Sequence, residues 1–137
     1  MATITEDYVS FETAKLLKEK GFNETCNRVY QGPNLKYTTL PISPLMSLGE
    51  LGGFHPKQLY VNNNELGDIV YTAPTLQMAM KWLREVYGLH IEPHIQTYKN
   101  YNGNIYNLDG ELLLGFTGES PEQACEAAIK YCLEYLI

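Results

Sequence analysis

The order of helix and strand patterns in the last third of the chain is the feature that most restricts its fold. Apolar residues recur at helical spacing from Leu76 to Tyr87, and Ser120 and Pro121 supply the cap and the first residue of a final helix. The expected helix, three strands and helix occupy residues 76–87, 90–98, 104–108, 111–117 and 121–135. This α-β-β-β-α order predicts an α+β fold with a small antiparallel sheet.

Turn and cap signals fix the expected details of this C-terminal cassette. Turns are predicted at 100–103 and at 109–110, between the strands. Pro74 is expected in the first turn of helix 76–87, with Ala73 or Thr75 as its cap, and Gly88 ends that helix. The last helix is expected to bury Ala124, Ala128, Tyr131, Cys132 and Tyr135 or Leu136.

A third helix is predicted over residues 11–20, with Ser10 as its cap and Gly21 at its end. The following segment, 23–73, is interrupted by proline and glycine but stays rich in apolar and aromatic residues. This composition predicts ordered, irregular structure. The chain is interpreted as a single domain, residues 1–137, with the parts 1–22, 23–73 and 74–137.

One regular element is expected inside the irregular segment. Strand-like residues at 58–61 and 68–72 flank the turn-forming stretch 62–67. This pattern predicts a β-hairpin.

Length and composition are sufficient for a hydrophobic core without crosslinks. The chain has 137 residues, of which 45% are hydrophobic. A chain of this length buries about two thirds of its unfolded surface. Its three cysteines, Cys26, Cys125 and Cys132, form an odd set without CxxC spacing, and no signal-peptide pattern opens the chain. We therefore expect free thiols, a cytoplasmic location and no membrane association, because no apolar stretch approaches about 20 residues.

The charge of the chain disfavours nucleic acid as a partner. The net charge is −6, from 10 Lys and Arg against 16 Asp and Glu, whereas duplex binding depends on clustered basic residues. The α-β-β-β-α order resembles the double-stranded RNA-binding domain, a resemblance that implies lysines at the start of the last helix. Those positions carry Glu119, Glu122 and Glu126 here. The likeness is one of topology, and no duplex binding by the last helix is expected.

No pattern typical of catalysis or metal binding is found in the sequence, so no catalytic residue, metal site or cofactor is expected. His90 and His94 are four residues apart, but Pro93 and strand-like surroundings would separate them by about 13 Å. Cys125 and Cys132 are interpreted as core residues on one helix face. A small metal-dependent hydrolase or nuclease that uses the histidines stays open as an alternative.

The aromatic content indicates either a half-exposed sheet or a binding surface. The chain has 11 tyrosines and one tryptophan, and most tyrosines fall in expected loops or strands. Tyrosine is frequent at interfaces because it offers a large contact area and loses little rotamer entropy.

Three stretches of sequence resemble a group of small proteins carried by phages and mobile elements of gut bacteria. They are YVSFETAKLLKEKGF at 8–22, APTLQMAMKWLREV at 73–86 and EQACEAAIKYCLE at 122–134. The resemblance covers the three helices, under half the chain, and brings no established activity or site residues. It implies a small accessory phage protein in the host cell cytoplasm.

The sequence therefore leads to the hypothesis of a non-enzymatic accessory protein that acts by binding, as a counter-defence factor. It would either inhibit a protein or sequester a small nucleotide signal between subunits of a homo-oligomer. A structural or virion-associated protein is a further alternative. The residues proposed to bind a ligand are Arg28, Lys57, Tyr60, Arg84 and Tyr98.

Overall fold

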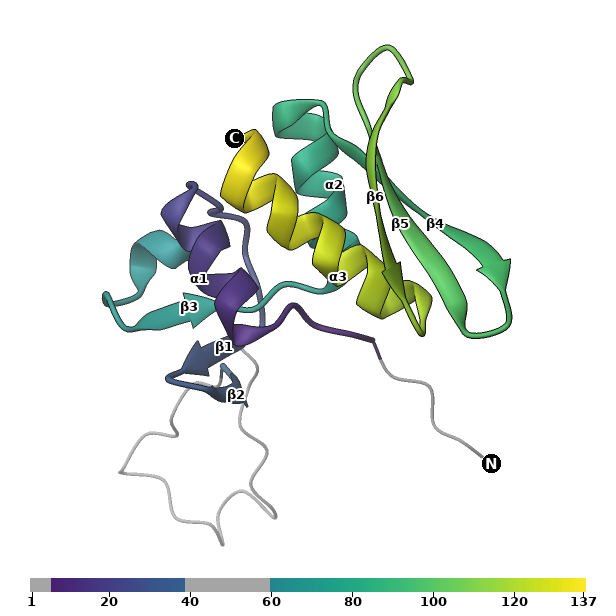
Figure 1. The fold of residues 1–137 in the computed structure, drawn as a ribbon. Helices are drawn as coiled ribbons and strands as arrows, with labels where there is room; N and C mark the ends of the chain where they lie inside the picture. The colour runs from purple at the N-terminus through teal and green to yellow at the C-terminus, as the bar shows by residue number, and fades with distance from the viewer. Residues whose placement is uncertain (1–5, 39–59) are drawn as a thin grey trace, which may run out of the picture.

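The computed structural model describes residues 6–38 and 60–137 and confirms the α+β class. Within these residues it contains three α-helices and two three-stranded antiparallel sheets (Figure 1). The sequence predicted the helices but only one sheet. No helix in the described part of the chain is both long and apolar enough to cross a membrane.

The C-terminal cassette has the predicted order, and its first helix, α2, spans Leu76–Tyr87 as expected. Thr75 caps α2, because its hydroxyl accepts a hydrogen bond of 3.2 Å from the backbone N–H of Met78. Pro74 precedes this cap, so its expected place in the first turn is wrong. Gly88 ends the helix in the left-handed region, with φ 68°.

The sheet that follows has the strand order β4-β5-β6. Its strands are β4 (His90–Thr97), β5 (Asn100–Tyr106) and β6 (Leu112–Gly118). The expected turn at 100–103 is wrong, because these residues belong to β5 and the chain reverses at Tyr98 and Lys99 instead. Starting β5 early lets Tyr101 pair with Ile95, and such cross-strand contacts outweigh the local turn preference of asparagine and glycine.

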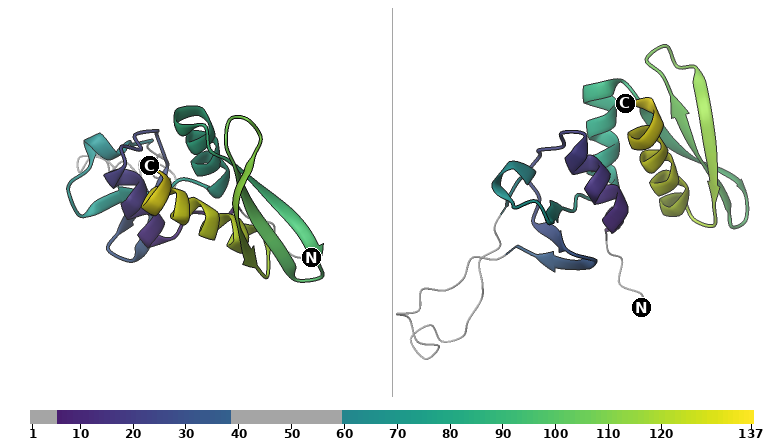
Figure 2. Two further views of the ribbon diagram at one scale, coloured as in Figure 1. Left: turned by 45° about the horizontal axis from the view of Figure 1, so that its top comes forward. Right: turned by 60° about the vertical axis from the view of Figure 1, so that its left-hand side comes forward.

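The last helix, α3 (Pro121–Tyr131), lies against one face of the β4-β5-β6 sheet (Figures 1 and 2). Ser120 caps it as predicted, with its hydroxyl 3.1 Å from the backbone nitrogen of Gln123. Near its start the helix approaches the sheet very closely. A Cβ on Gly103 would lie 2.3 Å from the carbonyl oxygen of Ala124. Glycine in β5 is therefore required by the helix–sheet spacing.

The end of the last helix differs from the expectation. Residues Cys132–Leu136 form a π-helical turn, η3, whose wider winding changes the direction of the later side chains. Cys132 and Leu133 are buried, whereas Tyr135 is 68% exposed and Leu136 is also exposed. The expected burial of Ala124, Ala128 and Cys132 is confirmed, Tyr131 is only partly buried, and the expected burial of Tyr135 or Leu136 is wrong.

The second sheet, in the order β2-β1-β3, lies in the segment expected to be irregular. It consists of β1 (Arg28–Gln31), β2 (Asn34–Tyr37) and β3 (Val70–Thr72). The hairpin expected between 58–61 and 68–72 is wrong for the part that the structure describes. β3 pairs with β1, and Val61 forms an isolated bridge with Cys26. Gly32, with φ 59°, makes the tight turn between β1 and β2. The Gly32-Pro33 pair is a turn signal that could have indicated this turn from the sequence.

A short 3-10 helix, η2 (Asn63–Glu65), joins this small sheet to the helices. Asn63 is buried, and its amide nitrogen donates to the carbonyl oxygen of Phe22 (2.7 Å). Its amide oxygen accepts from the backbone N–H of Thr72 (2.9 Å). One side chain thus satisfies two buried backbone groups that no strand pairing reaches.

The first helix, α1, spans Phe11–Glu19 and is capped by Ser10 as predicted, one residue shorter than expected at its end. Its buried apolar residues, Ala14 and Leu17, belong to one hydrophobic cluster that also includes residues of β1, α2, β4, β5 and α3. Trp82 of α2 packs edge-on against Phe22, with ring centroids 5.4 Å apart. The two sheets therefore share one core through the helices.

Candidate functional site

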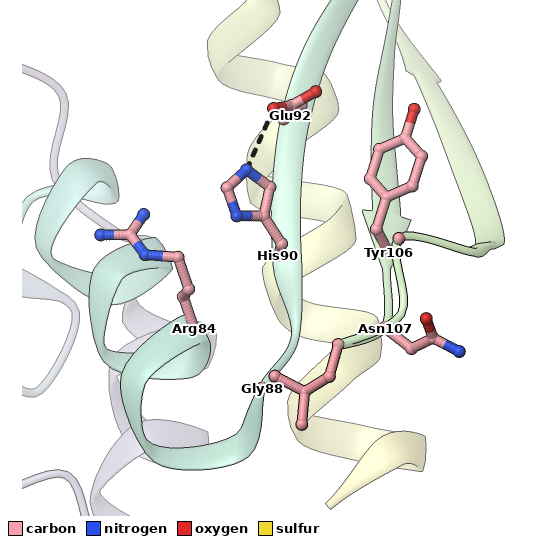
Figure 3. A pocket seen from close by; sticks show the side chains of 8 residues that line it. Arg84, Gly88, His90, Glu92, Tyr106 and Asn107 are labelled. Atoms are coloured by element: carbon pink, nitrogen blue, oxygen red, sulfur yellow. Dashed lines mark hydrogen bonds and ion pairs between the residues drawn. The ribbon is translucent and has the colours of Figure 1, made fainter.

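A hollow of about 350 Å³ lies where the end of α2, the start of β4 and the β5–β6 turn meet (Figure 3). This volume is near the lower end of the range for small-molecule sites, about 300 to 1,000 Å³. The hollow is lined by Arg84, Gly88, His90, Glu92, Tyr106, Asn107, Leu108 and Gly110. It combines a cation, a histidine, a carboxylate and an aromatic ring within one small space.

The positions of these side chains follow from simple backbone features. Arg84 lies in the last turn of α2, and the left-handed Gly88 directs the chain from the helix into β4. His90 and Glu92 are two residues apart in β4, so they lie on the same face of the sheet. Tyr106 is the cross-strand partner of His90 and therefore shares that face.

Glu92 fixes the orientation of the His90 ring. One carboxylate oxygen of Glu92 lies 3.1 Å from Nε2 of His90, as the dashed line in Figure 3 marks. A carboxylate accepts only, so this contact favours the tautomer with the proton on Nε2. The lone pair on Nδ1 of neutral His90 is then free to accept a hydrogen bond from a ligand.

The β5–β6 turn forms the opposite wall of the hollow. The side-chain oxygen of Asn107 accepts backbone N–H groups of Asp109 and Glu111, both at 2.9 Å, and so holds the turn in one shape. Leu108 of this turn lies directly against Gly88, where a Cβ would be 2.7 Å from its Cγ. The φ angle of Gly88 thus favours glycine strongly, and the close Leu108 side chain adds to the crowding at this position.

Of the residues proposed from the sequence, Arg84 lines this hollow, whereas Arg28, Tyr60 and Tyr98 lie elsewhere. Tyr98 is 85% exposed at the β4–β5 turn, about 25 Å along the strand from His90. Lys57 lies outside the described residues. The sequence-based proposal did not include His90, Glu92 or Tyr106 as ligand-binding residues. The His-x-Glu alternation at the start of an expected strand was the signal that could have indicated two of them.

Arg28 and Tyr60 lie near the small sheet. The guanidinium of Arg28 is stacked between two rings, 4.6 Å from the centroid of Tyr8 and 3.6 Å from that of Tyr37, and it donates to the Tyr37 hydroxyl. Tyr60 is 62% exposed and lines a separate hollow of about 330 Å³ together with Tyr8. Arg28 is therefore engaged by aromatic rings, whereas no ion pair or side-chain hydrogen bond holds Arg84 within the described ranges.

The acidic residues of α3 have a structural use that the sequence did not indicate. One carboxylate oxygen of Glu126 accepts hydrogen bonds from the backbone N–H of Ser10 (3.0 Å) and the hydroxyl of Thr13 (2.6 Å). It thus stabilises the N-terminus of α1. Lys130, one turn later, pairs with Glu12 at 2.9 Å, and its ammonium hydrogen bond lowers the pKa of that carboxyl.

The remaining candidates for chemistry are the other histidines and the cysteines. His94 lies on the same face of β4 as His90, about 13 Å farther along the strand, and is paired with Asn102 of β5. Among residues 6–38 and 60–137, no three His, Cys, Asp or Glu side chains are grouped closely enough to hold a metal ion. All three cysteines are free and buried, and burial raises the pKa of the Cys26 and Cys125 thiols to about 11.

The hollow at Arg84 offers a cation for an anionic group, an aromatic ring for stacking and an oriented hydrogen-bond acceptor. The comparisons with known proteins add no relative: no protein-family model, curated protein or solved structure matches this chain.

Proposed function

We propose that this protein binds a small nucleotide in the hollow between α2 and the β4-β5-β6 sheet and acts without chemical turnover. The observation that supports this proposal is that Arg84, the His90 ring held by Glu92, and Tyr106 all line one hollow. A nucleotide carries the three matching groups, namely a phosphate, a planar base and amino or hydroxyl donors.

Each of the three side chains has a defined role in this proposal. The Arg84 guanidinium presents several N–H donors in one plane and can bind a phosphate through two of them. The Tyr106 ring provides a stacking surface for a base, an interaction worth about 1 to 3 kcal/mol per base. Nδ1 of His90 accepts a hydrogen bond from an amino group or a ribose hydroxyl.

Glu92 makes the proposed site selective. Its carboxylate lies beside His90, so it repels a ligand that brings a second phosphate near that ring. A mononucleotide or a cyclic nucleotide, with its charge at one end, therefore suits the site better than a triphosphate. The net charge of −6 also disfavours highly charged ligands.

The resemblance to phage and mobile-element proteins supplies a biological setting for this binding. A small accessory protein in the host cytoplasm that sequesters a nucleotide signal would act against a defence pathway that depends on the signal. Sequestration requires affinity and abundance but no catalysis. Measurement of the mass in solution by light scattering, with and without nucleotide, would also test the proposed homo-oligomer.

Calorimetric titration with a panel of linear and cyclic nucleotides tests the proposal. We expect one or more mononucleotides to bind, and Arg84→Ala to weaken this binding by about tenfold or more. Lys81→Ala is the matched control, because Lys81 is an exposed cation on the same helix that does not line the hollow. Equal loss in both variants, or no binding by any nucleotide, would contradict the proposal.

The same titration separates binding from the hydrolase alternative. The contact between Glu92 and His90 is also the arrangement of an oriented general base, which is the one observation that favours an enzyme. Nucleotide recovered intact after long incubation, with and without divalent metal, would support sequestration. Recovery of a cleaved product that disappears in His90→Ala would support the enzyme instead.

A further inference from the structure

Strand β6 is an edge strand that lacks the charged residues and the proline that often protect an edge. It has one strand neighbour, β5, and no second one among the described residues. Half of its backbone N–H and C=O groups therefore point away from the sheet. Its sequence, Leu112–Gly118, contains no charge and no proline, and Leu112, Leu113 and Leu114 are 58%, 45% and 39% exposed.

The opposite edge of the same sheet is protected. β4 carries Pro93, which has no N–H to offer a new strand, and exposed Glu92 and His94 on either side of it. Charged side chains and proline are the common means by which proteins prevent unwanted pairing at an edge. The contrast within one sheet points to β6 as the edge that is open to another strand.

An apolar surface on α3 lies beside β6. Phe116 of β6 packs against Tyr131 with ring centroids 5.1 Å apart, and Tyr131 packs against Tyr135 at 4.9 Å. Tyr135 is 68% exposed, so its end of the aromatic row is open to a partner, whereas Phe116 and Tyr131 are partly buried against the core. A strand added to β6 would place alternate side chains over the face on which Phe116 and these rings lie.

The bulge in β6 limits where regular pairing can occur. Ile105 pairs with Leu114 and Tyr106 pairs with Leu112, so Leu113 is the extra residue of a β-bulge. Residues 114–118 keep a regular register with β5. They also include Phe116, so the regular part of the edge is the part next to the aromatic row.

The charges at the two ends of β6 indicate what kind of strand fits. Asp109 and Glu111 are exposed before the strand, and Glu119 and Glu122 are exposed after it. A second copy paired antiparallel about Gly115 would place Glu111 of one chain opposite Glu119 of the other, at both ends of the pairing. Like charges opposite one another destabilise a strand pair, so self-pairing centred on Gly115 is disfavoured.

We propose that the β6 edge binds an extended segment of another protein, with alternating apolar residues in its centre and lysine or arginine at both ends. The backbone groups of β6 supply hydrogen bonds, the Phe116–Tyr131–Tyr135 row receives the apolar side chains, and the carboxylates select for basic ends. This surface is distinct from the nucleotide hollow, so either site can exist without the other.

Fluorescence anisotropy with labelled synthetic peptides tests this proposal. The probe is a short peptide that alternates valine and threonine and has lysines at both ends. Its counterpart with glutamates at both ends has the same centre, and a third peptide has proline in the centre. We expect the basic peptide to bind about tenfold or more tightly than the acidic one at low salt, and the proline peptide to fail. Equal binding of the basic and acidic peptides would overturn the proposal.

Charge reversal at the ends of the strand gives a second test that leaves the core intact. Both Glu111 and Glu119 are exposed, so the double variant Glu111→Lys, Glu119→Lys should keep the native circular dichroism spectrum. The double variant should prefer the acidic peptide. The control is Glu85→Lys, which makes the same kind of charge change at an exposed position of α2 and should reduce the preference for the basic peptide by a much smaller factor.

The location of binding is read from backbone amide shifts of the isotope-labelled protein. Shifts concentrated at Gly115, Thr117 and Gly118 support the proposal, and shifts confined to other strands overturn it. A wild-type dimer in light scattering that Leu114→Lys dissociates would show that a second copy occupies the edge, and the proposal would then be wrong.

Discussion

The two three-stranded sheets of this protein are held together in different ways. The strands of β4-β5-β6 follow one another along the chain, and α3 covers one face of the sheet at very close range. In β2-β1-β3 the third strand comes from beyond residue 60, and a buried asparagine side chain replaces part of the backbone pairing. The β4-β5-β6 sheet thus depends on close packing against α3, and the β2-β1-β3 sheet depends on side-chain hydrogen bonds.

The largest expected effect comes from filling the helix–sheet contact. In Gly103→Ala the new Cβ would lie 2.3 Å from the carbonyl oxygen of Ala124, a backbone atom that cannot move aside cheaply. We expect a loss of about 3 kcal/mol or more in the free energy of unfolding, measured by urea denaturation. Gly67→Ala is the control beside the other sheet, in the turn before β3, since its new Cβ meets no atom within 4 Å and it should change stability by less than about 0.5 kcal/mol. Similar values for the two variants would remove the contrast.

Removal of the side chain that supports the small sheet should have the next largest effect. Asn63→Ala leaves the carbonyl of Phe22 and the N–H of Thr72 buried without their partner. The expected loss is about 2 kcal/mol. Asn64→Ala is the matched control, because Asn64 is exposed and contributes only its backbone N–H to Asn23. Calorimetric melting that gives both variants the wild-type midpoint would show that strand pairing alone holds β3.

A smaller loss of stability is expected at the contact between α3 and the start of α1. Glu126→Ala removes the acceptor for Ser10 and Thr13 at the start of α1 and should cost about 1 kcal/mol. Glu122→Ala removes an exposed carboxylate from the same helix and should cost a few tenths of a kcal/mol at most. If the two losses are equal in urea denaturation, Glu126 acts only as surface charge.

A loss of stability is also expected at alkaline pH, where its size depends on the pH chosen. Burial raises the pKa of Cys26 and Cys125 to about 11 and that of Cys132 to about 12. Thiols of the unfolded chain ionise near pH 8.5, so between about pH 8.5 and 11 the unfolded state holds fewer protons than the native state. The free energy of unfolding should therefore fall as the pH rises through this window. Urea denaturation at several pH values checks the slope, and a flat or rising profile would contradict it.

The same titration compares the two regions. Cys26 belongs to the small-sheet region, where it bridges Val61, and Cys132 lies within the end of the last helix. Cys26→Ala and Cys132→Ala should each reduce the alkaline slope, because each removes one thiol that resists ionisation in the native state. If the alkaline slope falls in only one of the two variants, the pH dependence arises in the region that contains that cysteine.

Local signals predicted the C-terminal cassette well. The apolar spacing, Thr75 or Ser120 as caps and Gly88 as a stop indicated α2 and the start of α3 almost to the residue. The local signals failed where contacts with distant residues decided the structure. Asn100 and Gly103 belong to β5, because both pair with β4 and Gly103 also packs against α3. The same cause explains the unpredicted pairing of β3 with β1.

For the candidate site, the sequence identified one member and the fold supplied the rest. Arg84 was recognised as a cation on a helix, but its neighbours His90 and Tyr106 come from different strands whose register was unknown. Arg28 was proposed for the same ligand, yet Tyr8 and Tyr37 enclose it at the other sheet.

The sequence by itself determined the α+β class, the three helices and most of their ends, because spacing, caps and glycine act over a few residues. Only the tertiary structure decided which strand joined the second sheet, that Glu126 serves α1, and which side chains share the hollow at Arg84. These depend on contacts between residues far apart in the chain, and no local pattern records such a contact.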